Sequence, residues 1–90
     1  MPLERGIGSV TEQPGGDVLF PMNDGPRRVS CRVTAEALYR LTGGRIRMPR
    51  RAFESVRLHV ESIASSKYDS GIVEEDGTVM ISPTDLGYGA

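Results

Sequence analysis

Hydrophobic and polar positions alternate strictly from residue 29 to residue 34, which predicts a strand with one buried face. The apolar members of this alternation are Val29, Cys31 and Val33. A short apolar run at residues 18–20 precedes it, and residues 23–26 (Asn-Asp-Gly-Pro) lie between the two runs. Asn and Gly tolerate positive φ and favour a turn there. The two runs therefore predict a β-hairpin.

Two later stretches have helical periodicity. The first begins after Thr34, whose hydroxyl suits an N-cap, and ends at the Gly43-Gly44 pair, which favours a left-handed helix end. The second begins at Pro49, because proline is harmless at the first helical position, and extends to about Tyr68. Its apolar residues fall on one stripe of the helix. They are Phe53, Val56, Val60, Ile63 and Ala64.

The C-terminal third predicts a second hairpin. Runs rich in β-branched residues, at 72–73 and 78–81, flank the pair Asp76-Gly77, which is a strong hairpin signal. Residues 82–85 resemble a capping box and predict a single helical turn that docks Leu86. The predicted fold is α+β in the order ββααββ, with one antiparallel sheet from two hairpins packed against two helices.

The two ends of the chain lack such patterns. Residues 1–16 have no sustained periodicity and end in Pro14-Gly15-Gly16, so we expect a disordered N-terminal arm. The chain of 90 residues suits one domain. We place this single α+β domain at residues 17–86, followed by a frayed C-terminus at residues 87–90.

The same elements resemble a known family. Residues 18–20, 23–25 and 29–38 resemble the opening of a bacterial family of uncharacterised proteins, domain-of-unknown-function family 1488. Similar residues follow at Phe53, 60–68, 76–79 and 85–86, so the resemblance covers about residues 17–86 and leaves out the N-terminal arm. It implies a small stand-alone bacterial α+β protein, and it supplies no functional residues to carry over.

Cysteine and histidine are too scarce for most catalytic or metal-binding arrangements. Cys31 is the one cysteine and His59 the one histidine. Cys31 lies on the predicted buried face, where a thiol acts as a small hydrophobe, and His59 lies at the edge of the helical stripe. An enzyme would need these two as nucleophile and base. We instead expect no catalytic residue, no cofactor and no metal, and we interpret the acids at 74–76 as a solvated hairpin tip.

Cysteine usage and hydropathy also bear on the compartment. One cysteine cannot form an intramolecular disulfide, which fits a reducing cytoplasm. No run approaches the roughly eighteen apolar residues of a membrane span, and the N-terminus lacks a signal-peptide pattern. We therefore expect a cytoplasmic protein that does not associate with membranes.

Charge is distributed unevenly, although the net charge is only −1. Residues 27–57 carry nine arginines against two glutamates, whereas residues 58–90 carry six acids against one lysine. Positive charge at the start of the second helix opposes the helix dipole, and a locally unfavourable cluster of this kind can bind an anion. The candidate binding surface consists of Arg27, Arg28, Arg32, Arg45, Arg47, Arg50 and Arg51.

These observations predict a non-enzymatic interaction module that binds a protein partner or itself, since its basic middle and acidic ends complement each other. The alternative is a nucleic-acid-binding accessory protein that uses the arginine-rich surface of residues 27–57. Against this alternative, the chain has no helix-turn-helix or RNA-recognition signature and its pI is about 5.8. In a third interpretation, the arginines pair with the acids of the same domain or keep a loop soluble.

Overall fold

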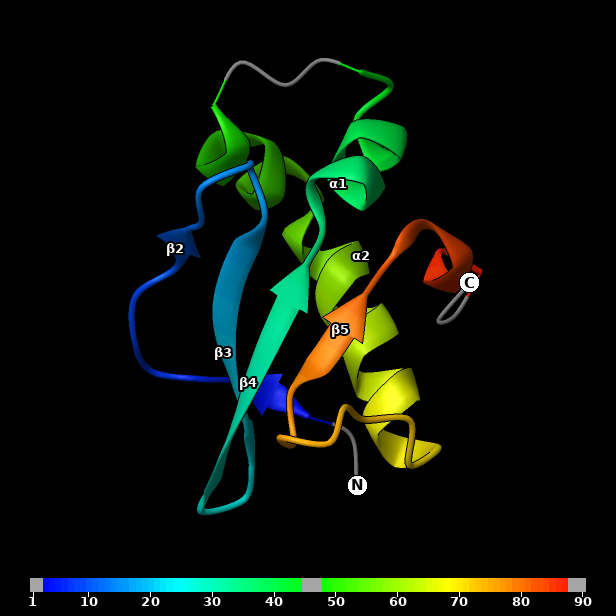
Figure 1. Cartoon of the computed structure of the whole chain (residues 1–90). Helices are drawn as coiled ribbons and strands as arrows, with labels where there is room; N and C mark the ends of the chain where they lie inside the picture. The colour runs from blue at the N-terminus through cyan, green and yellow to red at the C-terminus, as the bar shows by residue number, and fades with distance from the viewer. Residues whose placement is uncertain (1–2, 45–47, 88–90) are drawn as a thin grey trace.

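The computed structural model describes residues 3–44 and 48–87, in which a five-stranded sheet packs against two α-helices (Figure 1). In chain order the elements are β1 (Glu4–Arg5), β2 (Thr11–Glu12), β3 (Val18–Asp24), β4 (Arg27–Val33), α1 (Ala35–Leu41), α2 (Pro49–Asp69), β5 (Val79–Ile81) and a 3-10 turn, η1 (Pro83–Asp85). An α+β fold with a mostly antiparallel sheet is thus confirmed. The order ββααββ is wrong, because four strands precede the helices and one follows them.

The first hairpin forms as its alternation predicts. Strands β3 and β4 pair antiparallel from Val18 opposite Val33 to Asp24 opposite Arg27. Gly25 lies in the turn with a φ of 57°, the left-handed conformation that glycine adopts without steric cost. The apolar members of β4 are all buried, which confirms a strand with one buried face.

Both α-helices begin where their capping residues predict. The Thr34 side chain accepts a hydrogen bond from the Ala37 backbone N–H at 3.2 Å, which caps α1. Helix α2 begins at Pro49 and extends over 21 residues. The capping box of η1 is present, and Leu86 packs against the core as expected. No helix in the described ranges is long and apolar enough to cross a membrane.

The predicted second hairpin is wrong. The turn at Asp76-Gly77 exists, with Gly77 at a φ of 86° and the Glu74 N–H donating to the Thr78 carbonyl at 2.8 Å. Residues 72–73, however, belong to no strand and are exposed. Strand β5 instead pairs in parallel with β4, with Val79 opposite Cys31. The sheet order is therefore β1-β3-β4-β5, with β2 also on β3.

Burial explains why β5 pairs with β4 rather than with residues 72–73. In the parallel register, Val79 and Ile81 are both 0% exposed, and they contribute to the core beneath α2. The hydrophobic free energy gained by a strand scales with the apolar area that it removes from water. A local hairpin of β5 with residues 72–73 would bury less apolar area than the parallel pairing with β4 does. The non-local pairing therefore prevails over the turn signal.

The prediction of a disordered arm at residues 1–16 is also wrong for residues 3–16. Strands β1 and β2 both pair antiparallel with β3. Leu3 and Val10 are buried in the core, with 7% and 9% of their surface exposed. Strands of two residues are too short to produce an alternation, so neither could be recognised from its pattern.

Polar contacts fix these N-terminal residues to helix α2. The Leu3 backbone N–H donates to the Ser65 hydroxyl at 2.9 Å, and the Arg5 guanidinium donates to both carboxylate oxygens of Glu61 at 2.8 and 2.9 Å. The Glu61 carboxylate also accepts a hydrogen bond from Arg57 at 3.0 Å. The N-terminal segment is therefore part of the folded domain.

The close contact between Gly6 and strand β3 supports a specific prediction. A Cβ atom at Gly6 would lie 2.9 Å from the backbone carbon of Pro21 and 3.0 Å from the Met22 nitrogen. We expect Gly6→Ala to destabilise the fold by about 1–3 kcal/mol, since a rigid backbone must move. Urea unfolding measures this effect. Gly87→Ala is the control, because a Cβ there meets nothing within 4 Å, and equal stability of the two variants would contradict the prediction.

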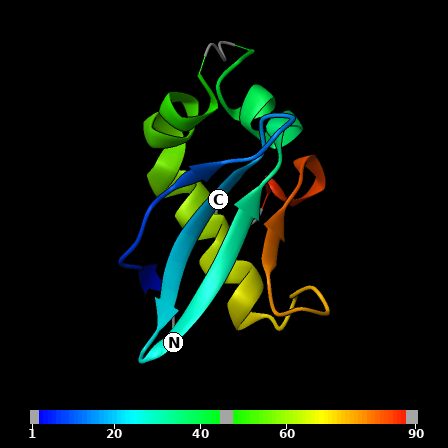
Figure 2. The same ribbon diagram turned by 60° about the vertical axis from the view of Figure 1, so that its left-hand side comes forward.

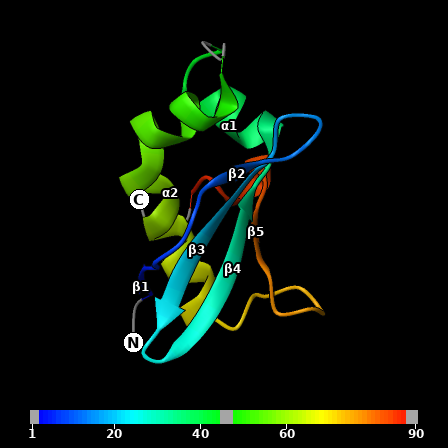
Figure 3. The ribbon, with the colours of Figure 1, turned by 90° about the vertical axis from the view of Figure 1, so that its left-hand side faces the viewer.

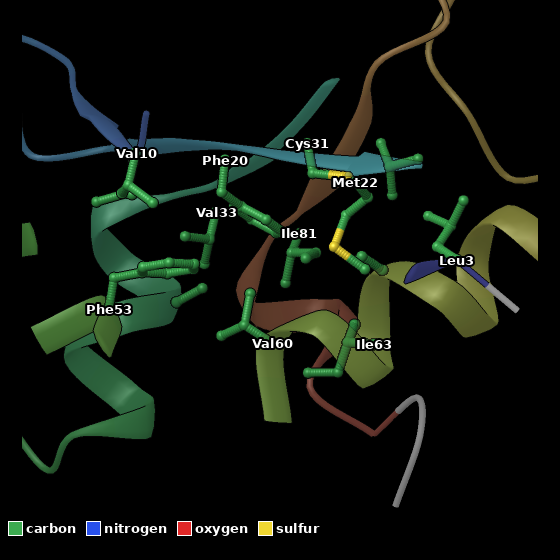
Figure 4. Close-up of a cluster of buried hydrophobic side chains, with 14 of the residues drawn as sticks. Leu3, Val10, Phe20, Met22, Cys31, Val33, Phe53, Val60, Ile63 and Ile81 are labelled. Carbon is green, nitrogen blue, oxygen red and sulfur yellow. The ribbon is translucent and has the colours of Figure 1, made fainter. Parts of the chain in front are cut away.

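The core lies between α2 and one face of the sheet. Figure 4 shows Phe53, Val60 and Ile63 of α2 facing Phe20, Met22, Val33 and Ile81 of the strands. Phe53 packs on Phe20 with ring centroids 4.9 Å apart. The predicted apolar stripe of α2 is thus the buried one, with Val56 partly buried at its margin.

Candidate protein-interaction surface

The predicted arginine surface is divided in the structure. Arg45 and Arg47 lie outside the described residues. Arg27 and Arg28 begin β4 at the hairpin tip, beside the C-terminal end of α2, whereas Arg50 and Arg51 lie in the first turn of α2 (Figures 1 and 2). At ~1.5 Å of rise per residue, the length of α2 separates the two pairs by about 27 Å. The five described arginines do not form one continuous basic surface.

Arg32, which lies between these pairs along the chain, is held in an ion pair. Its guanidinium donates two hydrogen bonds to one carboxylate oxygen of Asp17, at 2.6 and 2.9 Å. The other oxygen of Asp17 accepts the Ala35 backbone N–H at 2.8 Å. This arginine therefore helps to fix the start of α1, which agrees with the interpretation that arginines pair with acids of the same domain.

The N-terminus of α2 already has an anionic partner from the same chain. The Glu12 carboxylate, at the end of β2, accepts the backbone N–H of Arg50 at 3.0 Å. A carboxylate at this position interacts favourably with the helix dipole. The unfavourable arginines at the start of α2 are thus partly compensated by an acid that is distant in sequence, and the helix end is not an open anion site.

The sheet has one face without a helix. Figure 3 shows α2 on one side of the strands, while the segment that leads into β5 projects on the other side. Of the described elements, none covers this second face around Leu19, Arg32 and Met80, which are direct neighbours on β3, β4 and β5. We define the open face as Leu19, Ser30, Arg32 and Met80 together with residues 73–78.

A groove of about 860 Å³ lies on the open face. Leu19, Val73 and Met80 supply its apolar surface, and Val73 is 42% exposed. Its charged lining consists of Glu74, Glu75, Asp76 and Arg32. Carboxylates therefore outnumber cations in this groove by three to one.

A second hollow of about 450 Å³ adjoins the groove at the hairpin tip. It is lined by Arg27 and Arg28 and by one acid, Asp76, so its charge is opposite to that of the groove. The two hollows share four lining residues, which are Ser30, Val73, Asp76 and Thr78. Acidic and basic walls thus lie side by side on one surface.

Hydrogen bonds determine whether two titratable side chains beside these hollows, Asp76 and Tyr68, are charged. The Thr78 backbone N–H donates to the Asp76 carboxylate at 2.9 Å and lowers the pKa of Asp76, so this acid is ionised at neutral pH. At the other side of the basic hollow, the Tyr68 hydroxyl donates to Asp24 at 2.7 Å, which raises the pKa of Tyr68 and keeps it neutral.

The structure does not bring the catalytic candidates together as an accessible pair. Cys31 is 0% exposed, and burial raises the pKa of its thiol to about 12. His59 lies on the exposed side of α2, beside Leu58. In the described ranges, no group of three or more acidic, histidine or cysteine side chains could hold a metal ion, and the acids at 74–76 are exposed.

Burial of Cys31 makes thiol labelling a direct test. We expect Cys31 to react with a thiol reagent only after unfolding, because the reactive thiolate is scarce at such a pKa and the sulfur is inaccessible. The measurement compares labelling in buffer and in denaturant. A Ser62→Cys variant, with its new thiol on the exposed side of α2, is the positive control. Rapid labelling of native Cys31 would contradict the prediction.

Sequence reasoning missed two buried ionic contacts. Glu61 is 9% exposed and Lys67 is 6% exposed. Burial alone would raise the pKa of Glu61, but the hydrogen bonds from Arg5 and Arg57 outweigh it and lower the pKa. Lys67 pairs with Asp85 at 2.9 Å. The i,i+4 spacing of Arg57 and Glu61 is a local signal, but the contacts of Glu61 with Arg5 and of Lys67 with Asp85 depend on the packing of distant segments and have no local pattern.

Comparison with protein families identifies the relationship. The model of a family described as "Protein of unknown function (DUF1488)" matches residues 10–81, well over half of the chain. The chain belongs to the DUF1488 family. The resemblance found in the sequence is thereby confirmed, and the DUF1488 match begins before Asp17, so that it includes β2.

A solved DUF1488 structure has the same fold. It is the crystal structure of a family member of unknown function from Shewanella loihica PV-4, with a TM-score of 0.76 and 14% sequence identity. The similarity covers 89% of this chain and 91% of that chain. No curated protein matches the chain. The DUF1488 relationship thus establishes the fold and assigns no activity.

Proposed function

We propose that this chain is a non-enzymatic interaction module, and that it binds a protein partner through the open face. The observation that carries the proposal is the groove of about 860 Å³ on a sheet face that no described helix covers. Its apolar floor beside exposed charged residues has the composition of a protein interface, in which an apolar centre is surrounded by a polar rim.

The state of the candidate catalytic groups supports a binding role. The thiol of Cys31 is inaccessible, and His59 lies on the exposed side of α2. General acid–base and nucleophilic catalysis both need such groups within hydrogen-bond reach of a substrate. A single buried cysteine also suits the reducing cytoplasm, where we place this module.

The nucleic-acid alternative receives no support from the arrangement of the arginines. Affinity for nucleic acid comes mainly from cations that follow the phosphate backbone. In the described ranges, the pairs at residues 27–28 and 50–51 lie at opposite ends of α2, and Arg32 is neutralised by Asp17. We therefore retain protein binding as the single proposed function.

Site-resolved photo-crosslinking in host cells tests the proposal. A photoreactive phenylalanine analogue replaces either Val73 or Ser30 on the open face, and Ser62 on the exposed side of α2 serves as the matched control. We expect discrete protein adducts from the two open-face positions and none from position 62. Adducts from all three positions alike, or from none of them, would overturn the proposal.

A further inference from the structure

We infer that the partner of the open face is a second copy of this chain, docked about a twofold axis. This inference rests on the proposed function, since it names the occupant of the same surface. Three observations carry it: unpaired charges of both signs on the surface, their side-by-side placement, and an exposed apolar residue between them.

Three charged side chains of this surface form no ion pair with any of the described residues. Neither Glu74, Glu75 nor Arg28 takes part in an ion pair in the described part of the chain. Their placement differs from that of Arg32, whose charge is compensated by Asp17. The acidic groove and the basic hollow therefore each present uncompensated charge to an approaching molecule.

The two hollows have the geometry of a self-complementary patch. In a twofold interface the same patch is used by both copies, so residue i of one copy contacts residue j of the other and the reverse contact follows by symmetry. A twofold axis through the shared wall, which consists of Ser30, Val73, Asp76 and Thr78, would bring the acidic groove of each copy against the basic hollow of the other. Arg28 of each copy then faces Glu74 and Glu75 of the other copy, so the same contact occurs twice in the dimer.

Val73 supplies the apolar centre of this arrangement. It lines both hollows and is 42% exposed, and Met80 and Leu19 lie on the adjacent strands. At a twofold axis, Val73 meets its own symmetry copy, so that an apolar contact is surrounded by the charged rim. This arrangement closes on itself as a dimer, whereas a head-to-tail contact between opposite ends of α2 would form a larger ring or an open chain.

Sedimentation equilibrium of the whole chain over a concentration series tests the inference. We expect a dimer at low ionic strength and a weaker dimer at about 0.5 M salt, because exposed charges are screened there. Arg28→Glu and Glu75→Arg should each raise the dissociation constant about tenfold, since each change places like charges at two symmetric contacts. The double variant should restore dimerisation, because the exchanged pair is again complementary.

Controls carry the same charge changes elsewhere. Arg51→Glu in the first turn of α2 and Glu36→Arg on α1 lie away from the open face, and both should leave the dissociation constant unchanged. Urea unfolding of every variant establishes that it is folded. Failure of the double variant to restore the dimer, or equal weakening by the control variants, would overturn the inference.

The result also separates this inference from the proposed function. A wild-type chain that stays monomeric at low salt and every concentration overturns self-association. If Val73 of that monomer crosslinks to a different protein, the proposed function stands and only the identity of the partner is wrong. If the crosslinked species consists of two copies of this chain, both are supported.

Discussion

Phe53→Ala lowers the free energy of unfolding by about 3–5 kcal/mol, the largest effect we expect from any single substitution in this chain. Phe53 is 0% exposed and stacks against Phe20, with ring centroids 4.9 Å apart. The Arg57 guanidinium lies 5.4 Å from the centre of the same ring. Truncation therefore leaves a cavity and removes an aromatic contact and a cation–π contact together.

Urea unfolding monitored by circular dichroism measures this loss. Because small domains are stable by only about 5–15 kcal/mol, this loss removes a large share of the total, and at the lower end of the range part of the variant would be unfolded even without denaturant. Leu58→Ala on the same helix is the matched control, since Leu58 is 78% exposed and its truncation should change stability by less than about 0.5 kcal/mol. Similar losses in the two variants would contradict the assignment of the loss to core packing, since alanine is the better helix former at both positions.

Lys67→Ala gives the second largest expected loss, about 2–3 kcal/mol. The Lys67 ammonium donates to the Met80 carbonyl on β5 and to the Asp85 carboxylate at 2.9 Å, and its side chain is 8% exposed. Without it, a mostly buried carboxylate and a strand carbonyl each lose the hydrogen bond from the ammonium. The expected loss is below the 3–5 kcal/mol of a fully buried pair, because the Asp85 side chain retains 15% exposure and its bonds to Ser82.

An exposed ion pair provides the comparison for Lys67. Glu36 and Arg40 approach to 3.7 Å on α1, with 69% and 61% of their side chains exposed. Glu36→Gln should therefore cost at most about 0.5 kcal/mol. Urea unfolding of both variants under identical conditions makes the test, and a Lys67→Ala variant as stable as Glu36→Gln would refute the role assigned to this contact.

Capping and turn residues correctly predicted the elements whose stability depends on contacts between residues near in sequence. The cap at Thr34, the proline at position 49 and the glycine at position 25 each act on backbone groups within one turn. Their physical effect does not depend on the rest of the fold. For this reason both α-helices were predicted with nearly correct bounds, and the first hairpin was predicted with its turn, although β3 extends to Asp24, beyond the predicted run at residues 18–20.

The two wrong predictions concern segments whose partners are distant in sequence. Strand β5 pairs with β4 across both helices, and the N-terminal strands pair with β3 through contacts of two residues each. A turn signal at Asp76-Gly77 specifies only a chain reversal. The identity of the paired strand depends on which surface becomes buried, and one sequence does not reveal that surface.

The candidate surface illustrates the same limit. Nearness in sequence grouped Arg27 and Arg28 with Arg50 and Arg51, but the length of α2 separates them. The open face, in contrast, unites Leu19, Arg32 and Met80 through the pairing of three strands. It could be recognised only after the parallel position of β5 was known.

Pairing of β5 with β4 also has a consequence for synthesis of the chain. The hairpin of β3 and β4 leaves the ribosome early, yet one edge of β4 stays unpaired until β5 has been made. During that interval a nascent chain exposes a strand edge that neighbouring nascent chains can join. Strand β5 also brings two fully buried side chains, so its arrival closes the core and removes the hazard in a single late step.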